Sequence, residues 1–91
     1  MKKHSDNIPR QAWIRSTGDL GRYLRAYRKA RGINLETAAG LSNVSIKFLS
    51  EFERGKETAE IGKVLKVLNA VGLKLIIEQR YKGTPRFELK E

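Results

Sequence analysis

The 91-residue chain contains no cysteine and only one histidine, His4. Without thiols it has neither a disulfide framework nor a thiolate metal site. His4 lies in a polar N-terminal stretch with no evident ligand partner, so a solvated side chain is the ordinary explanation for it. We therefore expect no metal and no cofactor.

Long apolar runs are also missing from the sequence. No run approaches the roughly 20 residues that span a membrane, and the N-terminus lacks the apolar centre of a signal peptide. Paired carboxylates in a pocket pattern, a nucleophile beside a base and a glycine-rich phosphate loop are all absent. The expectation is a cytoplasmic protein that has no membrane partner and is not an enzyme.

Acidic residues are few compared with basic ones. Nineteen Lys and Arg stand against ten Asp and Glu, which gives a net charge of +9. Residues 1–32 hold nine of the basic and two of the acidic side chains, whereas residues 33–72 hold five of each. This balance favours nucleic acid or an acidic protein surface as the partner. A chain this short is also near the lower limit for one hydrophobic core, which favours additional stabilisation by a second chain.

Residues 16–72 have the apolar periodicity of helices. A first helix is predicted to begin at Ser16 or Thr17, both good N-caps, and to stop at Gly32, which suits the C-terminal cap. A second helix of about two turns is predicted to follow at once, with Asn34 as its N-cap. Ala38 and Ala39 in this second helix are small enough to let another helix approach closely.

A short turn leads from the second predicted helix to the third. Asn43 can adopt the left-handed conformation that such a turn needs. Ser45 is the natural cap of the third helix and Gly55 its end, and a fourth helix is predicted over residues 60–71. A short helix, a tight turn and an amphipathic helix form the helix-turn-helix plan, in which one helix braces another that enters the major groove.

The sequence changes period after the fourth predicted helix. Leu73, Leu75 and Ile77 alternate with polar positions, and Ile76 adds a further β-branched residue, which is the pattern of a strand. Because no second convincing strand is present, we predict pairing with the same strand of a second copy. The alternative is an edge that caps the helices of its own domain.

These patterns divide the chain into four predicted segments. Residues 1–15 form an N-terminal arm, residues 16–72 the helix-turn-helix domain, residues 73–80 a dimerisation strand and residues 81–91 a C-terminal tail. The arm carries apolar side chains, Trp13 among them, and these are expected to dock either on the body of the protein or on a partner. The sequence leaves both possibilities open.

The run from Leu20 to Leu73, which begins LGRYLRAYRKARG, resembles the Cro and phage-repressor class (Cro/C1, or XRE, family) without a gap. The segments FLSEFERGK and AEIGKVLKVLNAVGLKL further resemble the HipB-type antitoxins, small repressors encoded beside HipA-type kinase toxins. The resemblance implies a mostly α, lambda-repressor-like helix-turn-helix domain of four to five helices. Its C-terminal β-strand would pair across a homodimer.

The resemblance also implies roles for individual residues by position. The side chains expected to face base edges are Ser45, Ile46, Lys47 and Ser50. Those expected to contact phosphates are Asn34, Arg54 and Lys56. Arg28 and Glu53 match a structural ion pair between the first helix and the end of the third, with DNA contact by Arg28 as the alternative. The expected dimer strand uses Leu73, Leu75, Ile76 and Ile77.

The third helix departs from the class at several positions. Ile46 and Phe48 replace residues that are commonly polar, and Glu51 stands where Gln often reads bases. Isoleucine can contact a thymine methyl, and Lys47 can donate to guanine O6 or N7. Glu51 would accept from cytosine N4 or repel phosphate. We therefore expect few direct base contacts, and an interface or core role for Ile46 and Phe48 is the competing explanation.

The function implied is that of a DNA-binding transcriptional repressor and antitoxin of a type II toxin–antitoxin module. Such a protein binds double-stranded operator DNA as a homodimer, represses its own operon and neutralises a HipA-like Ser/Thr kinase toxin. The alternative is an interaction module or adaptor that binds an acidic protein partner without sequence-specific DNA contact. The basic first helix, with Arg22, Arg25 and Lys29, suits either function.

Overall fold

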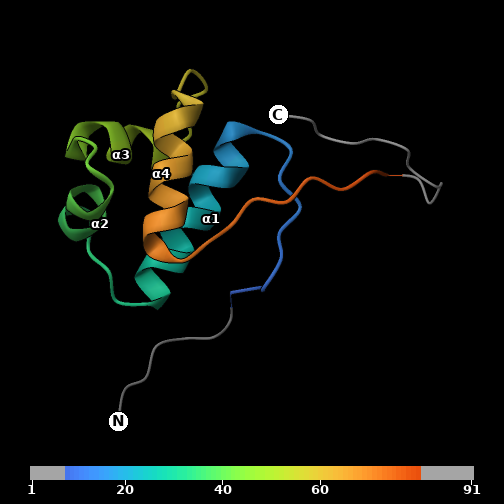
Figure 1. The fold of residues 1–91 in the computed structure, drawn as a ribbon, viewed down its shortest axis with the longest axis horizontal. Coiled ribbons are helices and arrows are strands. Elements are labelled where there is room, and N and C mark those ends of the chain that lie inside the picture. The colour runs from blue at the N-terminus through green and yellow to red at the C-terminus, as the bar shows by residue number, and fades with distance from the viewer. Residues whose placement is uncertain (1–7, 81–91) are drawn as a thin grey trace, which may run out of the picture.

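The computed structural model describes residues 8–80, and these residues form four helices and no β-strand (Figure 1). The helices are α1 (Thr17–Ala30), α2 (Leu35–Ser42), α3 (Ile46–Glu53) and α4 (Ile61–Val71). Helix α2 packs on both α3 and α4, and α1 packs on α3. The predicted mostly α, helix-turn-helix fold is therefore confirmed.

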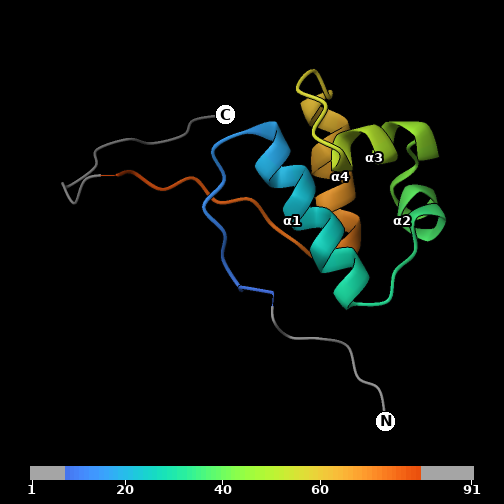
Figure 2. The same ribbon diagram turned by 180° about the vertical axis from the view of Figure 1, so that it is seen from behind.

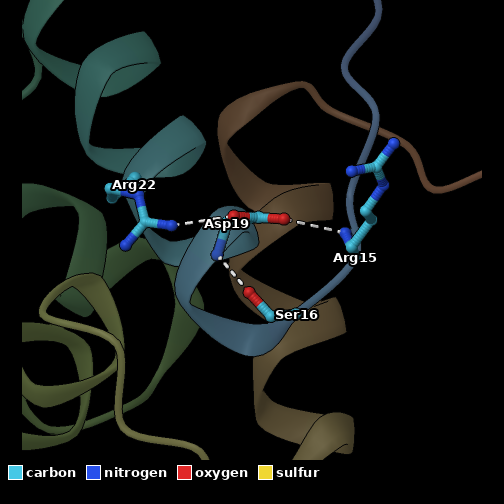
Figure 3. Close-up of polar contacts among 4 residues, drawn as sticks. All are labelled: Arg15, Ser16, Asp19 and Arg22. Atoms are coloured by element: carbon cyan, nitrogen blue, oxygen red, sulfur yellow. Dashed lines mark hydrogen bonds and ion pairs between the residues drawn. The ribbon is translucent and has the colours of Figure 1, made fainter.

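Helix α1 begins with a reciprocal set of hydrogen bonds around its first turn (Figure 3). The Ser16 hydroxyl accepts from the backbone N–H of Asp19 at 3.0 Å. The Asp19 carboxylate accepts from the backbone N–H of Arg15 at 2.9 Å and from the Arg22 guanidinium at 2.7 Å. The hydrogen bond from Arg15, with help from Arg22, lowers the pKa of Asp19 below its ordinary value. This network ties the end of the N-terminal arm to α1.

The helix-turn-helix unit is set by side chains close to each other in the sequence. The Asn34 side chain accepts from the N–H of Thr37 at 2.7 Å, and the Ser45 hydroxyl accepts from the N–H of Phe48 at 2.9 Å. Between the two helices Asn43 has φ 58° and ψ 45°, the left-handed conformation predicted for it. Each N-cap satisfies an N–H that the helix itself leaves free, so Asn34 fixes where α2 begins and Ser45 where α3 begins, while Asn43 ends α2.

All four helices contribute to the core, and α2 supplies the small residues Ala38 and Ala39. The largest fully buried side chains of the core are Leu24, Phe52, Leu49, Val64 and Val67. Helix α4 carries two apolar stripes rather than one: Ile61 and Leu65 are 60% and 39% exposed, although they share the helical spacing of the buried residues. The spacing alone therefore does not tell the buried stripe of α4 from the exposed one.

Gly21 allows α1 to pass directly over the end of α3. A Cβ added at Gly21 would overlap the carbonyl oxygen of Phe52 and would stand 3.2 Å from the Cα of Glu53. Gly21 is buried, and its backbone is helical, so the reason for glycine is the close approach of two helices. The close approach joins residues far apart in the chain, and the need for glycine at this position was not predicted from the sequence.

Two segments lie on the side of the molecule away from α2 and α3 (Figure 2). The arm is held at Pro9, whose carbonyl accepts from the Tyr23 hydroxyl, while Trp13 stays 70% exposed. Residues 73–80 leave α4 without helical or strand structure, so the predicted strand pairing stays a prediction. Residues 1–7, with His4, and the predicted tail, 81–91, lie outside the described residues.

Candidate nucleic-acid interface

The outer face of α3 is the first part of the candidate interface. Leu49 and Phe52 anchor the helix with 0% and 1% of their surface exposed, whereas Ile46 is 47% exposed. Phe48 is half-buried and stacks on Phe52, with 6.3 Å between ring centroids. The Lys63 ammonium lies 5.5 Å from the Phe48 ring centroid. Phe48 thus extends the core, while Ile46 is free to contact a partner.

Both lysines of the predicted interface are held by one carboxylate. Lys47, one turn before Glu51 on α3, and Lys56, in the following loop, each have their ammonium 3.1 Å from a separate oxygen of Glu51. The loop turns back because the Lys56 N–H bonds to the carbonyl of Glu51 at 3.1 Å. The hydrogen bond from Lys56, and then that from Lys47, lowers the pKa of Glu51 below its ordinary value.

This arrangement around Glu51 was only partly visible in the sequence. The i, i+4 spacing of Lys47 and Glu51 could have indicated their ion pair. The pair between Lys56 and Glu51 depends on the loop after α3, where Gly55 adopts φ 97°. The outer face of α3 therefore presents its lysines already partnered.

A basic hollow lies beside α3, and it is the second part of the candidate interface. It has a volume of about 940 Å³ and lies between α1, the loop from α1 to α2, and the end of α3. Its charged and polar lining comprises Arg22, Arg25, Arg28, Lys29, Asn34, Ser50, Glu53 and Arg54. Within residues 8–80, Arg25, Lys29 and Arg54 form no ion pair. The hollow is therefore suited to an anion.

Arg28 and Glu53 form a buried ion pair in the lining of this hollow. The Arg28 Nε and Nη2 atoms each donate to a Glu53 carboxylate oxygen at 2.7 Å, and Nη1 donates to the Ile33 carbonyl at 2.9 Å. Arg28 and Glu53 are 6% and 5% exposed. The hydrogen bond with Glu53 raises the pKa of Arg28. Because its guanidinium is already bonded on three nitrogens, Arg28 joins α1 to α3 rather than presenting a free charge.

The N-terminus of α2 opens into the same hollow. Ile33, Asn34 and Leu35 all line it. The side-chain oxygen of Asn34 (Oδ1) accepts from the backbone N–H of Thr37, which leaves the side-chain NH₂ group of Asn34 as a donor. Helix N-termini carry partial positive charge and free N–H groups, and the nearby arginines and lysine add to the attraction for a phosphate.

The predicted site residues therefore fall into separate groups. Ser45, Ile46 and Lys47 lie at the start of α3, whereas Ser50, Asn34 and Arg54 line the hollow. The predicted dimer strand, residues 73–80, lies on the side away from α2 and α3 (Figure 2); Leu73 is half-buried against the core, whereas Leu75, Ile76 and Ile77 are exposed. Arg25 and Lys29, which lie in the hollow, were noticed in the sequence only as part of a basic helix.

No helix within residues 8–80 is both long and apolar enough to cross a bilayer. No group of three or more His, Cys, Asp or Glu in the same range could hold a metal ion.

Comparison with known proteins agrees with this geometry. Residues 19–75 match a family model described as a helix-turn-helix domain, so the chain belongs to that family. It is a DNA-binding transcriptional regulator of the Cro and phage-repressor type, and this predicted resemblance is confirmed. A similar protein is the uncharacterized HTH-type transcriptional regulator y4mF of Sinorhizobium fredii. The two are 38% identical over 64 residues, which cover 70% of this chain and 84% of the relative.

Proposed function

We propose that this regulator is a cytoplasmic, non-enzymatic repressor that binds operator DNA in its own promoter as a homodimer. We further propose that it is the antitoxin of a type II toxin–antitoxin module and neutralises a HipA-like Ser/Thr kinase toxin. The observation that carries the DNA-binding part is the position of the basic hollow directly beside the exposed face of α3.

On the DNA side, the roles follow from the placement of side chains. Helix α3 would enter a major groove about 12 Å wide. Ser45, Ile46 and Lys47 would then meet base edges, with Ser50 further along the helix. The DNA phosphates that border this groove would contact Asn34 at the start of α2, and Arg54 and Lys56 in the loop after α3.

Dimerisation would use residues 73–80. Leu75, Ile76 and Ile77 are exposed, and Ile77 is 95% exposed, which leaves apolar surface that a second copy would cover. A strand pair formed there would leave α2 and α3 of both copies free, because this segment lies on the opposite side of the domain (Figure 2). Two-fold related α3 helices would read half-sites about one helical turn apart, or a multiple of it.

The antitoxin part rests on the resemblance of residues 48–56 and 59–75 to the HipB-type antitoxins. The first range covers the end of α3 and its loop, and the second covers α4 and the start of the predicted dimer strand. Co-expression with a kinase encoded next to this gene, followed by purification of the complex and a kinase assay, tests it. Unchanged kinase activity in the presence of this protein would contradict the antitoxin role.

A mobility-shift experiment across a salt series tests DNA binding. The probe is the DNA upstream of the gene, and log affinity should fall steeply with log salt because phosphate contacts release counterions. Lys47→Ala should cost about 1 to 3 kcal/mol on the specific site, and Arg54→Ala should weaken binding to all sequences. Lys66→Ala is the matched control, since Lys66 is exposed on α4 and lies outside the hollow.

The same experiment separates this function from its alternative. An affinity that does not change with salt, together with unaltered binding by Lys47→Ala and Arg54→Ala, would favour an interaction module without DNA contact. An equal loss for Lys47→Ala on every DNA sequence would make Lys47 a phosphate contact instead of a base contact.

A further inference from the structure

Glu51 is the one acidic side chain on the outer face of α3. The other acid of this helix, Glu53, is buried against Arg28. The Glu51 carboxylate lies between Lys47 at the start of α3 and Lys56 after its end, 3.1 Å from each ammonium. Both lysines are DNA contacts in the proposed function, so one carboxylate holds two of the cations that DNA would need.

If Lys47 and Lys56 bound only phosphates, the Glu51 carboxylate would lose both of its ion-pair partners. The ion pairs are solvent-exposed, so a phosphate can draw Lys47 and Lys56 away from Glu51 at small cost. Glu51 would then lie unpaired beside a polyanion. A cytosine in the major groove changes this, because its N4 amino group donates a hydrogen bond that a carboxylate accepts. The free-energy cost of bringing Glu51 close to DNA therefore depends on the DNA sequence.

We propose that Glu51 is a specificity-determining residue that restrains Lys47 and Lys56 in the free protein and selects DNA that offers it a cytosine amino group. The inference rests on the proposed DNA-binding function and deepens it. Discrimination here works chiefly through a repulsive element, which weakens binding to wrong sequences more than to the right one. The outer face of α3 has few amide and arginine side chains that could select bases by attraction, so repulsion by Glu51 contributes a larger share of the specificity.

Glu51→Gln tests the proposal, with Glu57→Gln as the matched control. Both variants remove one negative charge near α3, but Glu57 is exposed and forms no ion pair within residues 8–80. Binding is measured for a random-sequence duplex and for the upstream DNA. Glu51→Gln should bind the random duplex on the order of tenfold tighter and the upstream DNA by a smaller factor, so that the specificity ratio falls.

A selection from a pool of randomised duplexes gives a second readout. The wild-type protein should enrich cytosine at one position of each half-site, and Glu51→Gln should shift that preference towards adenine, which an amide recognises. If Glu51→Gln matches Glu57→Gln in affinity and enriches the same bases as the wild type, the role of Glu51 is refuted while the repressor function stands. If the wild type binds neither duplex in a salt-dependent way, the proposed function fails and this inference fails with it.

Discussion

The side of the molecule formed by α2 and α3 lies opposite the side formed by residues 8–15 and 73–80 (Figure 2), and the two sides carry different side chains. Beside α2 and α3, helix α1 and the loop after α3 supply arginines and a lysine, and the N-termini of α2 and α3 are capped by Asn34 and Ser45. The other side carries exposed apolar residues on segments without regular structure, Trp13 and Ile77 among them. A basic surface suits a polyanion, whereas exposed apolar surface suits burial against another chain.

The largest expected effect comes from breaking the ion pair inside the basic side. Glu53→Ala leaves the Arg28 guanidinium buried without its carboxylate, and the free energy of unfolding should fall by about 3 to 5 kcal/mol. Urea unfolding measures this loss, and Glu57→Ala is the exposed control. A loss below about 1 kcal/mol would mean that Arg28 reaches solvent and that the pair does not hold the hollow together.

The contact between α1 and α3 is tested next, because it sets one wall of the hollow. Gly21→Ala should lower the free energy of unfolding by about 1 to 3 kcal/mol, since the added methyl group overlaps the Phe52 carbonyl. Gly62→Ala on α4 is the control: nothing lies within 4 Å of its added Cβ, so helix propensity should make this change neutral or stabilising. Similar destabilisation by both substitutions would contradict the close approach at Gly21.

Charged substitutions on the apolar side should separate it from the basic side. Leu75→Glu combined with Ile77→Glu is expected to convert a dimer to a monomer in analytical sedimentation, with little change in the helical circular dichroism signal. The reason is that both side chains are exposed in the single chain, so only an interface between copies buries them. Gln79→Glu serves as a control of charge in the same segment, and an unchanged dimer would place the interface elsewhere.

The smallest effect is expected where the two sides meet, at the start of α1. The pKa of Asp19 is lowered in the folded protein, so its contribution to stability is present above the ordinary pKa of 3.8 and is lost as the pH falls below it. Asp19→Asn should therefore flatten the decline of stability in acid. Thermal unfolding of both proteins across this pH range measures the difference, and parallel curves would show that the network in Figure 3 contributes nothing.

Sequence reasoning predicted the helices well because their ends depend on neighbouring residues. Ser16, Asn34 and Ser45 cap within three residues of themselves, and Asn43 turns the chain by its own conformation. Helical spacing does not distinguish the exposed Ile61 and Leu65 of α4 from its buried residues, because which side of a helix is buried depends on the elements packed against it. Phe48 was left undecided between core and interface for the same reason, and packing against Phe52 settles it.

The candidate site was predictable only in part. The residues at the start of α3 followed from its resemblance to a known class, and the charge excess of the first helix was visible in the composition. The joint lining of one hollow by Arg25, Lys29 and Arg54 was not visible, because it requires α1 and α3 to lie together. The same holds for Lys56, which reaches Glu51 only after the loop has turned back.

The sequence by itself determined the helical segments, their caps, the left-handed turn at Asn43 and the basic character of the chain, since each of these is local chemistry or a simple sum of charges. Only the tertiary structure decided that Gly21 must be a glycine and that Lys47 and Lys56 share Glu51. It also decided that Arg25, Lys29 and Arg54 line one hollow. The physical reason is that these features arise between helices and loops, where a distance in space replaces a spacing along the chain.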